Sequence, residues 1–108
     1  ILDTAMNDLM RPALYGATHK IMPALRKTKI LKENHEFVGP ICESTDSFLT
    51  LKKFQILREN EIIVMCDVGA YGMSLSSNYN LRPKPIELMI KGSKIKVIKK
   101  RQKHTDFI

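Results

Sequence analysis

The sequence is poor in the residues on which several kinds of protein depend. Its 108 residues include no tryptophan, only two cysteines and only three histidines. Two cysteines cannot build a disulfide framework, so we expect reduced thiols and a cytoplasmic location. His19, His35 and His104 are too widely spaced to form a ligand cluster, so no metal site is expected.

Long apolar runs and targeting signals are also missing. No stretch approaches the ~18 apolar residues that a membrane-spanning helix needs. The opening ILDTAMNDLM carries acids where a signal peptide would be basic. Because the chain begins with Ile1 rather than Met, we expect a fragment or a processed chain. Its composition, 44% hydrophobic and 27% charged, is typical of a globular domain.

Positive charge is in excess, and it gathers near the C-terminus. The formal net charge is +7, and residues 91–104 hold seven Lys and Arg residues with no acid. Such a segment can bind nucleic acid, or it can be a solvated strand face and tail. No aromatic platform or zinc-finger spacing accompanies the charge, which favours the second interpretation and no nucleic-acid partner.

The apolar pattern predicts a mainly β domain with short helices. A continuous run over 62–66 indicates a strand buried on both faces, and residues 86–98 indicate a final hairpin. Residues 27–34 read as an exposed hairpin connection. Short helical turns are expected within 5–15, with Pro12 near an end, and within 67–76. Further strands are expected over 19–26 and over 36–42, with a break at Gly39-Pro40. Residues 1–3 could end a strand, and residues 46–52 could form a short strand or a turn.

One loop is unusually rich in glycine, hydroxyl and tyrosine: GAYGMSLSSNYNLRPKP, residues 69–85. Its Gly69-Ala70-Tyr71-Gly72 start matches neither a dinucleotide-binding nor a P-loop pattern. The glycines could let the backbone approach a ligand while Tyr71 presents its hydroxyl. They could equally form a tight turn with Tyr71 packed in the core.

Two cysteines differ in their surroundings. Cys42 stands beside Glu43, and a negative neighbour disfavours a thiolate nucleophile. A protonated Cys42 could instead donate a proton, while Glu43 could hold an ammonium group. The alternative is a small buried cysteine followed by an exposed acid. Cys66, inside the apolar run, is expected to be structural.

Arg11 and Tyr15 stand four residues apart, which places them on one face of a helical turn. Together they could bind a carboxylate, Arg11 through a bidentate bond and Tyr15 through its hydroxyl. A surface salt bridge and a packed tyrosine are the alternative.

Three segments, taken together, resemble a known family. MNDLMRPALY (6–15), GPICESTD (39–46) and DVGAYGMSLSSNYNLRPKPIE (67–87) are similar to three signature blocks of the diaminopimelate decarboxylases. They occur in that family's order and at compatible spacing. The Thr4-Ala5 pair and Lys84 depart from the family pattern, and none of these residues carries an assigned role.

The resemblance implies a fold and a cofactor. The family belongs to the alanine-racemase-like class of pyridoxal-phosphate enzymes, which have an N-terminal β/α barrel and a C-terminal β domain. Residues 1–108 resemble the β-sandwich or barrel-like C-terminal domain. The cofactor-bearing lysine and phosphate-binding loop should lie in the barrel, which at ~250 residues cannot fit into this chain. The isolated chain is therefore expected to be inactive.

The resemblance also implies residue roles. Tyr71 would contact cofactor and substrate, Arg11 and Tyr15 would bind a substrate carboxylate, and Glu43 would bind the distal amino group. Cys42 would donate the proton that replaces carbon dioxide. Cys42 and Glu43 are expected to serve the neighbouring subunit's site, which implies a homodimer.

The implied activity is decarboxylation of meso-diaminopimelate to L-lysine, a step of lysine biosynthesis. A related decarboxylase of ornithine, arginine or carboxynorspermidine is one alternative, although Cys42-Glu43-Ser44 argues against it. The other is a non-enzymatic module that binds through its positive charge.

Overall fold

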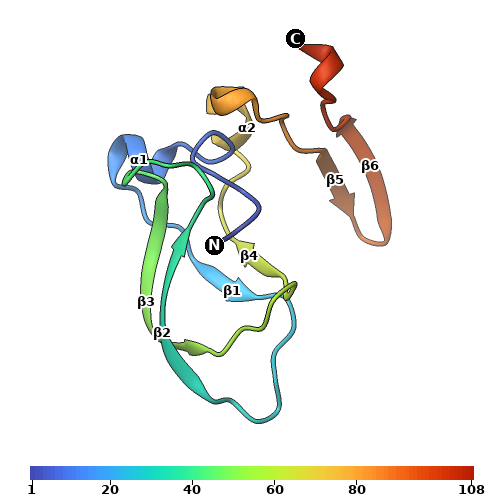
Figure 1. The fold of residues 1–108 in the computed structure, drawn as a ribbon. Coiled ribbons are helices and arrows are strands. Elements are labelled where there is room, and N and C mark those ends of the chain that lie inside the picture. Colours follow the sequence, from blue (N-terminus) through green and yellow to red (C-terminus); the bar gives the residue numbers. More distant parts are fainter.

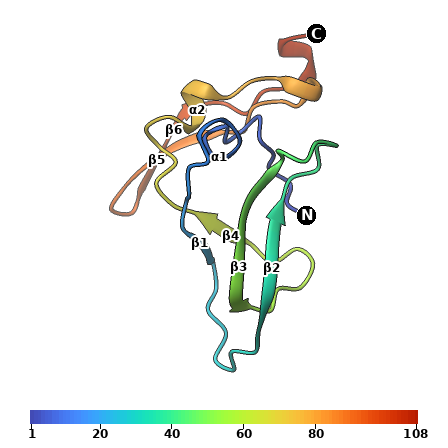
Figure 2. The same ribbon diagram turned by 90° about the vertical axis from the view of Figure 1, so that its left-hand side faces the viewer.

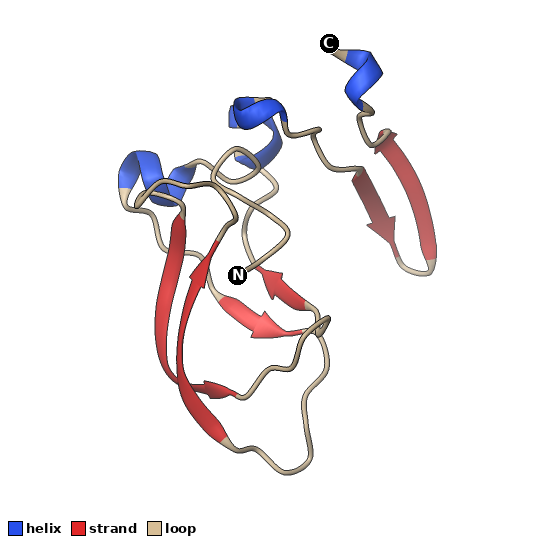
Figure 3. Cartoon of the chain, in the orientation of Figure 1, coloured by secondary structure: helices blue, strands red, loops and turns tan.

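The computed structural model describes all 108 residues and confirms a mainly β chain with short helices (Figures 1 and 3). Its six strands form three separate two-stranded antiparallel sheets. The pairs are β1 (Ile21–Pro23) with β4 (Ile63–Met65), β2 (Lys32–Val38) with β3 (Ser47–Gln55), and β5 (Glu87–Lys91) with β6 (Lys94–Lys99). The helices are α1 (Arg11–Tyr15), α2 (Gly72–Leu75), η1 (Tyr79–Leu81) and η2 (His104–Asp106).

The core is small and lies around the β2–β3 sheet. Leu9, Ile21, Phe37 and Phe48 form its buried cluster. Phe54 extends it, with its ring edge-on to that of Phe37 at a centroid distance of 5.1 Å. Each fully buried side chain of this size contributes roughly 1.5–3 kcal/mol. The β5–β6 hairpin lies apart from this core, as Figures 1 and 2 both show.

Helix α1 has clear signals at both ends. Pro12 lies in its first turn, where the missing N–H costs no hydrogen bond. Gly16 ends the helix with a left-handed φ of 65°, and its N–H donates to the Pro12 carbonyl at 3.0 Å. The predicted placement of Pro12 near a helix end is confirmed.

The loop between β2 and β3 is held by a buried carboxylate. Asp46 is 3% exposed, and its two oxygens accept the backbone N–H groups of Met6 and Ile41, each at 2.7 Å. The Gly39 N–H donates to the Asp46 carbonyl at 2.9 Å. A Cβ on residue 39 would collide with this carboxylate, which explains why the strand stops at a glycine.

The expectation that 62–66 is a strand buried on both faces is wrong. Strand β4 has three residues, and Val64 within it is 42% exposed, while Ile62 just before it is 71% exposed. The reason is that β4 pairs only with β1, which leaves one edge and part of a face open. Cys66 is only partly buried, and its thiol lies 3.8 Å from the Met22 sulfur.

The connection predicted over 27–34 is also different from expectation. It joins β1 and β2, which lie in separate sheets, and so it is not a hairpin turn. Lys27 fixes its start, since its ammonium donates to Glu61 at 2.9 Å and to the Ile56 carbonyl at 2.7 Å. The bond from Lys27 lowers the pKa of the Glu61 carboxyl.

Two other strand predictions differ in length. Residues 1–3 form no strand, although the Leu2 N–H donates to the Val38 carbonyl at 2.8 Å. Strand β3 continues to Gln55, three residues beyond the expected end at Lys52. The final hairpin is confirmed, and Gly92 supplies the positive φ of 60° in its turn.

We predict that Asp46→Asn destabilises the protein. An amide has only one acceptor oxygen, so its NH₂ group would face the N–H of either Met6 or Ile41. A buried donor without a partner costs about 1–3 kcal/mol in the free energy of unfolding. Equilibrium urea unfolding measures the loss. Asp67→Asn, at an exposed site, is the matched control and should change stability by no more than about 0.5 kcal/mol. Equal midpoints for both variants would contradict the anchoring role of Asp46.

Candidate functional site

Arg11 and Tyr71 come together, although they are far apart in the sequence. The guanidinium carbon of Arg11 lies 5.7 Å from the centroid of the Tyr71 ring, a cation–π distance. Arg11 begins α1, and Tyr71 immediately precedes α2. Tyr71 is 59% exposed, so the alternative of a packed core tyrosine is wrong.

Tyr15 lies at the end of α1, one helical turn after Arg11. Its side chain is 67% exposed, and it shares the short helix with Arg11 at the expected spacing. The structure contains two ion pairs, Lys27–Glu61 and His35–Glu33, and neither involves Arg11. The alternative of a surface salt bridge with a packed tyrosine is therefore wrong. Arg11, Tyr15 and Tyr71 form what we call the arginine cluster.

Cys42 and Glu43 both lie on the surface of the β2–β3 loop. Ile41 just before them is buried, and the turn is closed by the Asp46 N–H, which donates to the Glu43 carbonyl at 3.0 Å. The alternative of a buried Cys42 is thus wrong. Neither thiol of the chain is in a disulfide. The loop presents a thiol and a carboxylate side by side.

The Glu43 carboxylate has a neighbour that the sequence did not single out. The Tyr79 hydroxyl donates to one carboxylate oxygen, and the Thr45 hydroxyl donates to the other at 3.4 Å. Tyr79 begins η1 and lies in the Ser-Ser-Asn-Tyr-Asn run. An unusual tyrosine in that polar run was the only signal that could have identified it. Cys42, Glu43 and Tyr79 form the acidic cluster.

No hydrogen bond or ion pair joins the two clusters within the chain. Arg11 contacts Tyr71, whereas Glu43 contacts Tyr79 and Thr45. The structure thus brings the predicted residues together in two groups and does not bring the groups to one another.

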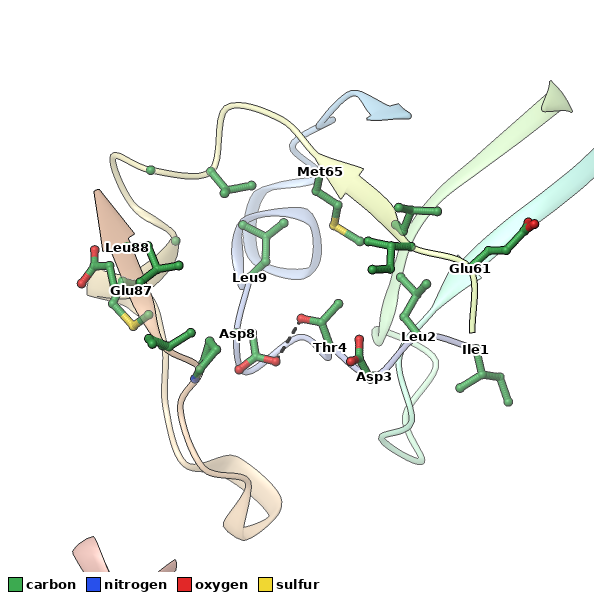
Figure 4. A pocket seen from close by; sticks show the side chains of 18 of the residues that line it. Ile1, Leu2, Asp3, Thr4, Asp8, Leu9, Glu61, Met65, Glu87 and Leu88 are labelled. Atoms are coloured by element: carbon green, nitrogen blue, oxygen red, sulfur yellow. Dashed lines mark hydrogen bonds between the residues drawn. The ribbon is translucent and has the colours of Figure 1, made fainter. Parts of the chain in front are cut away.

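A large cavity lies elsewhere, and Figure 4 shows side chains that line it. It has a volume of about 880 Å³ and is lined by the N-terminal segment, β4 and the start of β5. Thr4 and Asp8, joined by a 3.0 Å hydrogen bond, contribute polar atoms to a mixed lining that also includes the acids Asp3, Glu61 and Glu87. None of the five predicted site residues lines it, so the cavity is not part of the candidate site.

No group of three or more His, Cys, Asp or Glu side chains is arranged to hold a metal ion. None of the helices has the length and apolar character to cross a membrane.

Comparison with known families gives one match. Residues 1–69 match the family described as "Pyridoxal-dependent decarboxylase, C-terminal sheet domain". Curated relatives include the diaminopimelate decarboxylase of Vibrio cholerae, 42% identical over 94% of this chain and 24% of the relative. The enzyme of that name from Aquifex aeolicus is 37% identical over 100% of this chain and 25% of the relative.

Solved structures agree in fold. A diaminopimelate decarboxylase of M. jannaschii has a TM-score of 0.88 and 35% identity, over 96% of this chain and 24% of that one. The Helicobacter pylori enzyme, solved as a complex with L-lysine, has a TM-score of 0.80 and 40% identity, over 96% and 25%. The chain therefore spans about a quarter of the length of these relatives.

We predict that Cys42 reacts faster than Cys66 with a thiol reagent such as iodoacetamide. Cys42 is exposed, whereas Cys66 is partly buried against Met22. Mass spectrometry of peptides at successive times measures both rates in one sample. The fast phase should vanish in Cys42→Ser and persist in Cys66→Ser. Faster labelling of Cys66 would contradict the exposed position of Cys42.

Proposed function

The chain belongs to the pyridoxal-dependent decarboxylases as a C-terminal sheet domain, and we propose that it is part of a diaminopimelate decarboxylase. The whole enzyme would convert meso-diaminopimelate to L-lysine and carbon dioxide. Residues 1–108 would form one domain of it. One observation carries the proposal: a half-buried cation, Arg11, and an exposed anion, Glu43, both lie outside the ion pairs of the chain.

The substrate class follows from these two charges. The reacting end of diaminopimelate carries an amino and a carboxylate group, and so does its far end. Glu43 can bind the distal ammonium, while Arg11 and Tyr15 can bind a carboxylate by charge-assisted hydrogen bonds. A substrate without the distal carboxylate, such as ornithine, would make less use of Arg11 with Tyr15. The L-lysine bound to the Helicobacter pylori relative supports this choice of chemistry.

The family description implies pyridoxal phosphate as the cofactor. The exposed Tyr71 ring, with its hydroxyl and the adjacent guanidinium of Arg11, fits contact with a flat anionic group. When bound, pyridoxal phosphate supplies a conjugated electron sink for the electrons left when carbon dioxide departs. Its principal binding residues, including the lysine that carries it, would lie outside this domain.

Cys42 is proposed to complete the reaction as the proton donor. Its Sγ–H bond breaks, the proton goes to the carbon that lost carbon dioxide, and the sulfur keeps the electron pair as a thiolate. Water then returns a proton to the sulfur. Because Cys42 is exposed, its thiol can reach a substrate held by another part of the protein.

The separation of the two clusters supports a homodimer. Within one chain, no hydrogen bond or ion pair links Arg11 or Tyr71 to Cys42 or Glu43. If each site combines the arginine cluster of one subunit with the acidic cluster of the other, both ends of one substrate can be held. The two free thiols fit the cytoplasmic location that we propose for this dimer.

We predict that Cys42→Ala lowers kcat for lysine formation in the full-length enzyme by about 10²- to 10⁴-fold, the usual contribution of a positioned acid. Cofactor absorbance should survive, because Cys42 is not expected to hold the cofactor. Cys66→Ala, which removes the thiol outside the site, is the control and should keep most of the activity. Unchanged turnover in Cys42→Ala would remove this residue from the proton-donor role.

We also predict that the 108-residue chain alone forms no lysine from meso-diaminopimelate, whereas the full-length enzyme does. The reason is that the cofactor lysine is expected in the barrel. Released lysine and carbon dioxide measure both activities. Ornithine turnover by the full-length enzyme without lysine formation from diaminopimelate would contradict the proposed function.

A further inference from the structure

We propose that Tyr79 is a positioning residue, which fixes the Glu43 carboxylate so that it can receive the distal ammonium of the substrate. This inference rests on the proposed function and adds a specificity-determining residue to it. Three features support it: the contact itself, the anchoring of both loops, and the charge left on Glu43.

The first feature is the contact between the two side chains. The Tyr79 hydroxyl donates to one oxygen of Glu43, and Thr45 donates to the other at 3.4 Å. Both donors are neutral, so they orient the carboxylate without cancelling its charge. Each oxygen keeps a lone pair for a further donor, since a carboxylate offers about four acceptor sites.

The second feature is that two adjacent residues hold both loops. The Met6 N–H donates to Asp46, which closes the turn that carries Glu43. Asn7, fully buried, accepts the Ser77 N–H at its carbonyl at 3.0 Å, and its side chain donates to the Ser77 carbonyl at 3.1 Å. Because Met6 and Asn7 are consecutive, the turn of Glu43 and the turn of Tyr79 are fixed relative to one another.

The turn around Tyr79 is itself well defined. The Asn78 side chain donates to the Arg82 carbonyl at 2.9 Å and to the Gln102 side chain at 2.7 Å. Asn80 and Leu81 both have positive φ, of 58° and 55°. Asparagine tolerates this conformation better than most residues, whereas leucine rarely adopts it. The turn therefore has a specific shape, and it directs the Tyr79 side chain toward Glu43.

The third feature is that no cation neutralises Glu43. Neither of the two ion pairs in the structure includes it, although the chain carries 18 Lys and Arg residues. An exposed glutamate would ordinarily sample many rotamers. Tyr79 restricts them before the substrate arrives, so that less freedom is lost on binding. The expected effect is on substrate affinity rather than on the chemical step.

Tyr79→Phe in the full-length enzyme tests the inference, because it removes only the hydroxyl. We expect KM for meso-diaminopimelate to rise about 3- to 10-fold, the usual net effect of one lost hydrogen bond, with kcat within about 2-fold. The inhibition constant of L-lysine, which keeps the distal ammonium, should rise by a similar factor. Ser93→Ala is the control: its hydroxyl lies in the exposed β5–β6 turn, away from both clusters, so all three constants should stay unchanged. Thermal unfolding should show the same midpoint for both variants.

A double-mutant cycle with Glu43→Gln separates positioning from a structural role. If Tyr79 acts through the Glu43 carboxylate, adding Tyr79→Phe to Glu43→Gln should change kcat/KM by less than about 2-fold. The same loss in both backgrounds would overturn the inference, as would an unchanged KM in the single variant. In either case lysine formation by the unsubstituted enzyme would leave the proposed function standing. Its absence would reject the proposed function and the inference together.

Discussion

The buried carboxylate of Asp46 is the constraint on which the candidate site depends. It accepts two backbone N–H groups from segments that are far apart in the sequence, at Met6 and at Ile41. A charge buried to this degree is stable only when its oxygens are bonded, so the two segments must meet there. Since Met6 lies just before α1, the same interaction helps to place Arg11. The same carboxylate explains the glycine at position 39, because any side chain there would displace the carboxylate of Asp46.

Elements defined by local signals could be predicted from the sequence, and elements defined by distant pairing could not. Pro12 and Gly16 bracket α1, and Gly92 makes the last turn, so these features follow from neighbouring residues. By contrast, an apolar run at 62–66 does not reveal that β4 pairs only with β1 and stays partly exposed. The hydrophobic periodicity likewise did not predict where β3 ends. The strand reaches Gln55 because Gln55 pairs with Lys32 of β2.

In the candidate site, too, the features that depend on distant parts of the chain could not be predicted from the sequence. Composition left each residue with two interpretations, and only the resemblance to a family assigned roles. Exposure of Tyr71 and of Cys42 is a tertiary property, and the structure removed the alternatives in which each was buried. Tyr79 was missed because its partner Glu43 is 36 positions away, and no spacing pattern relates them. The contact between Tyr79 and Glu43 can be recognised only in the folded chain, where adjacent residues hold both loops.

The candidate site suits its proposed substrate because the charges of Arg11 and Glu43 both remain available to a ligand. In a chain with 18 basic and 11 acidic residues, an exposed glutamate would readily attract a lysine. Here Glu43 is held by neutral hydroxyls, and Arg11 lies over an aromatic ring instead of beside an acid. Neither contact neutralises the charge, and an uncompensated charge of each sign is what a ligand with both ammonium and carboxylate groups needs. Were the two clusters adjacent in one subunit, Arg11 and Glu43 would pair with one another. In the proposed homodimer, the two clusters would meet across two subunits with the substrate between them, which would avoid that loss.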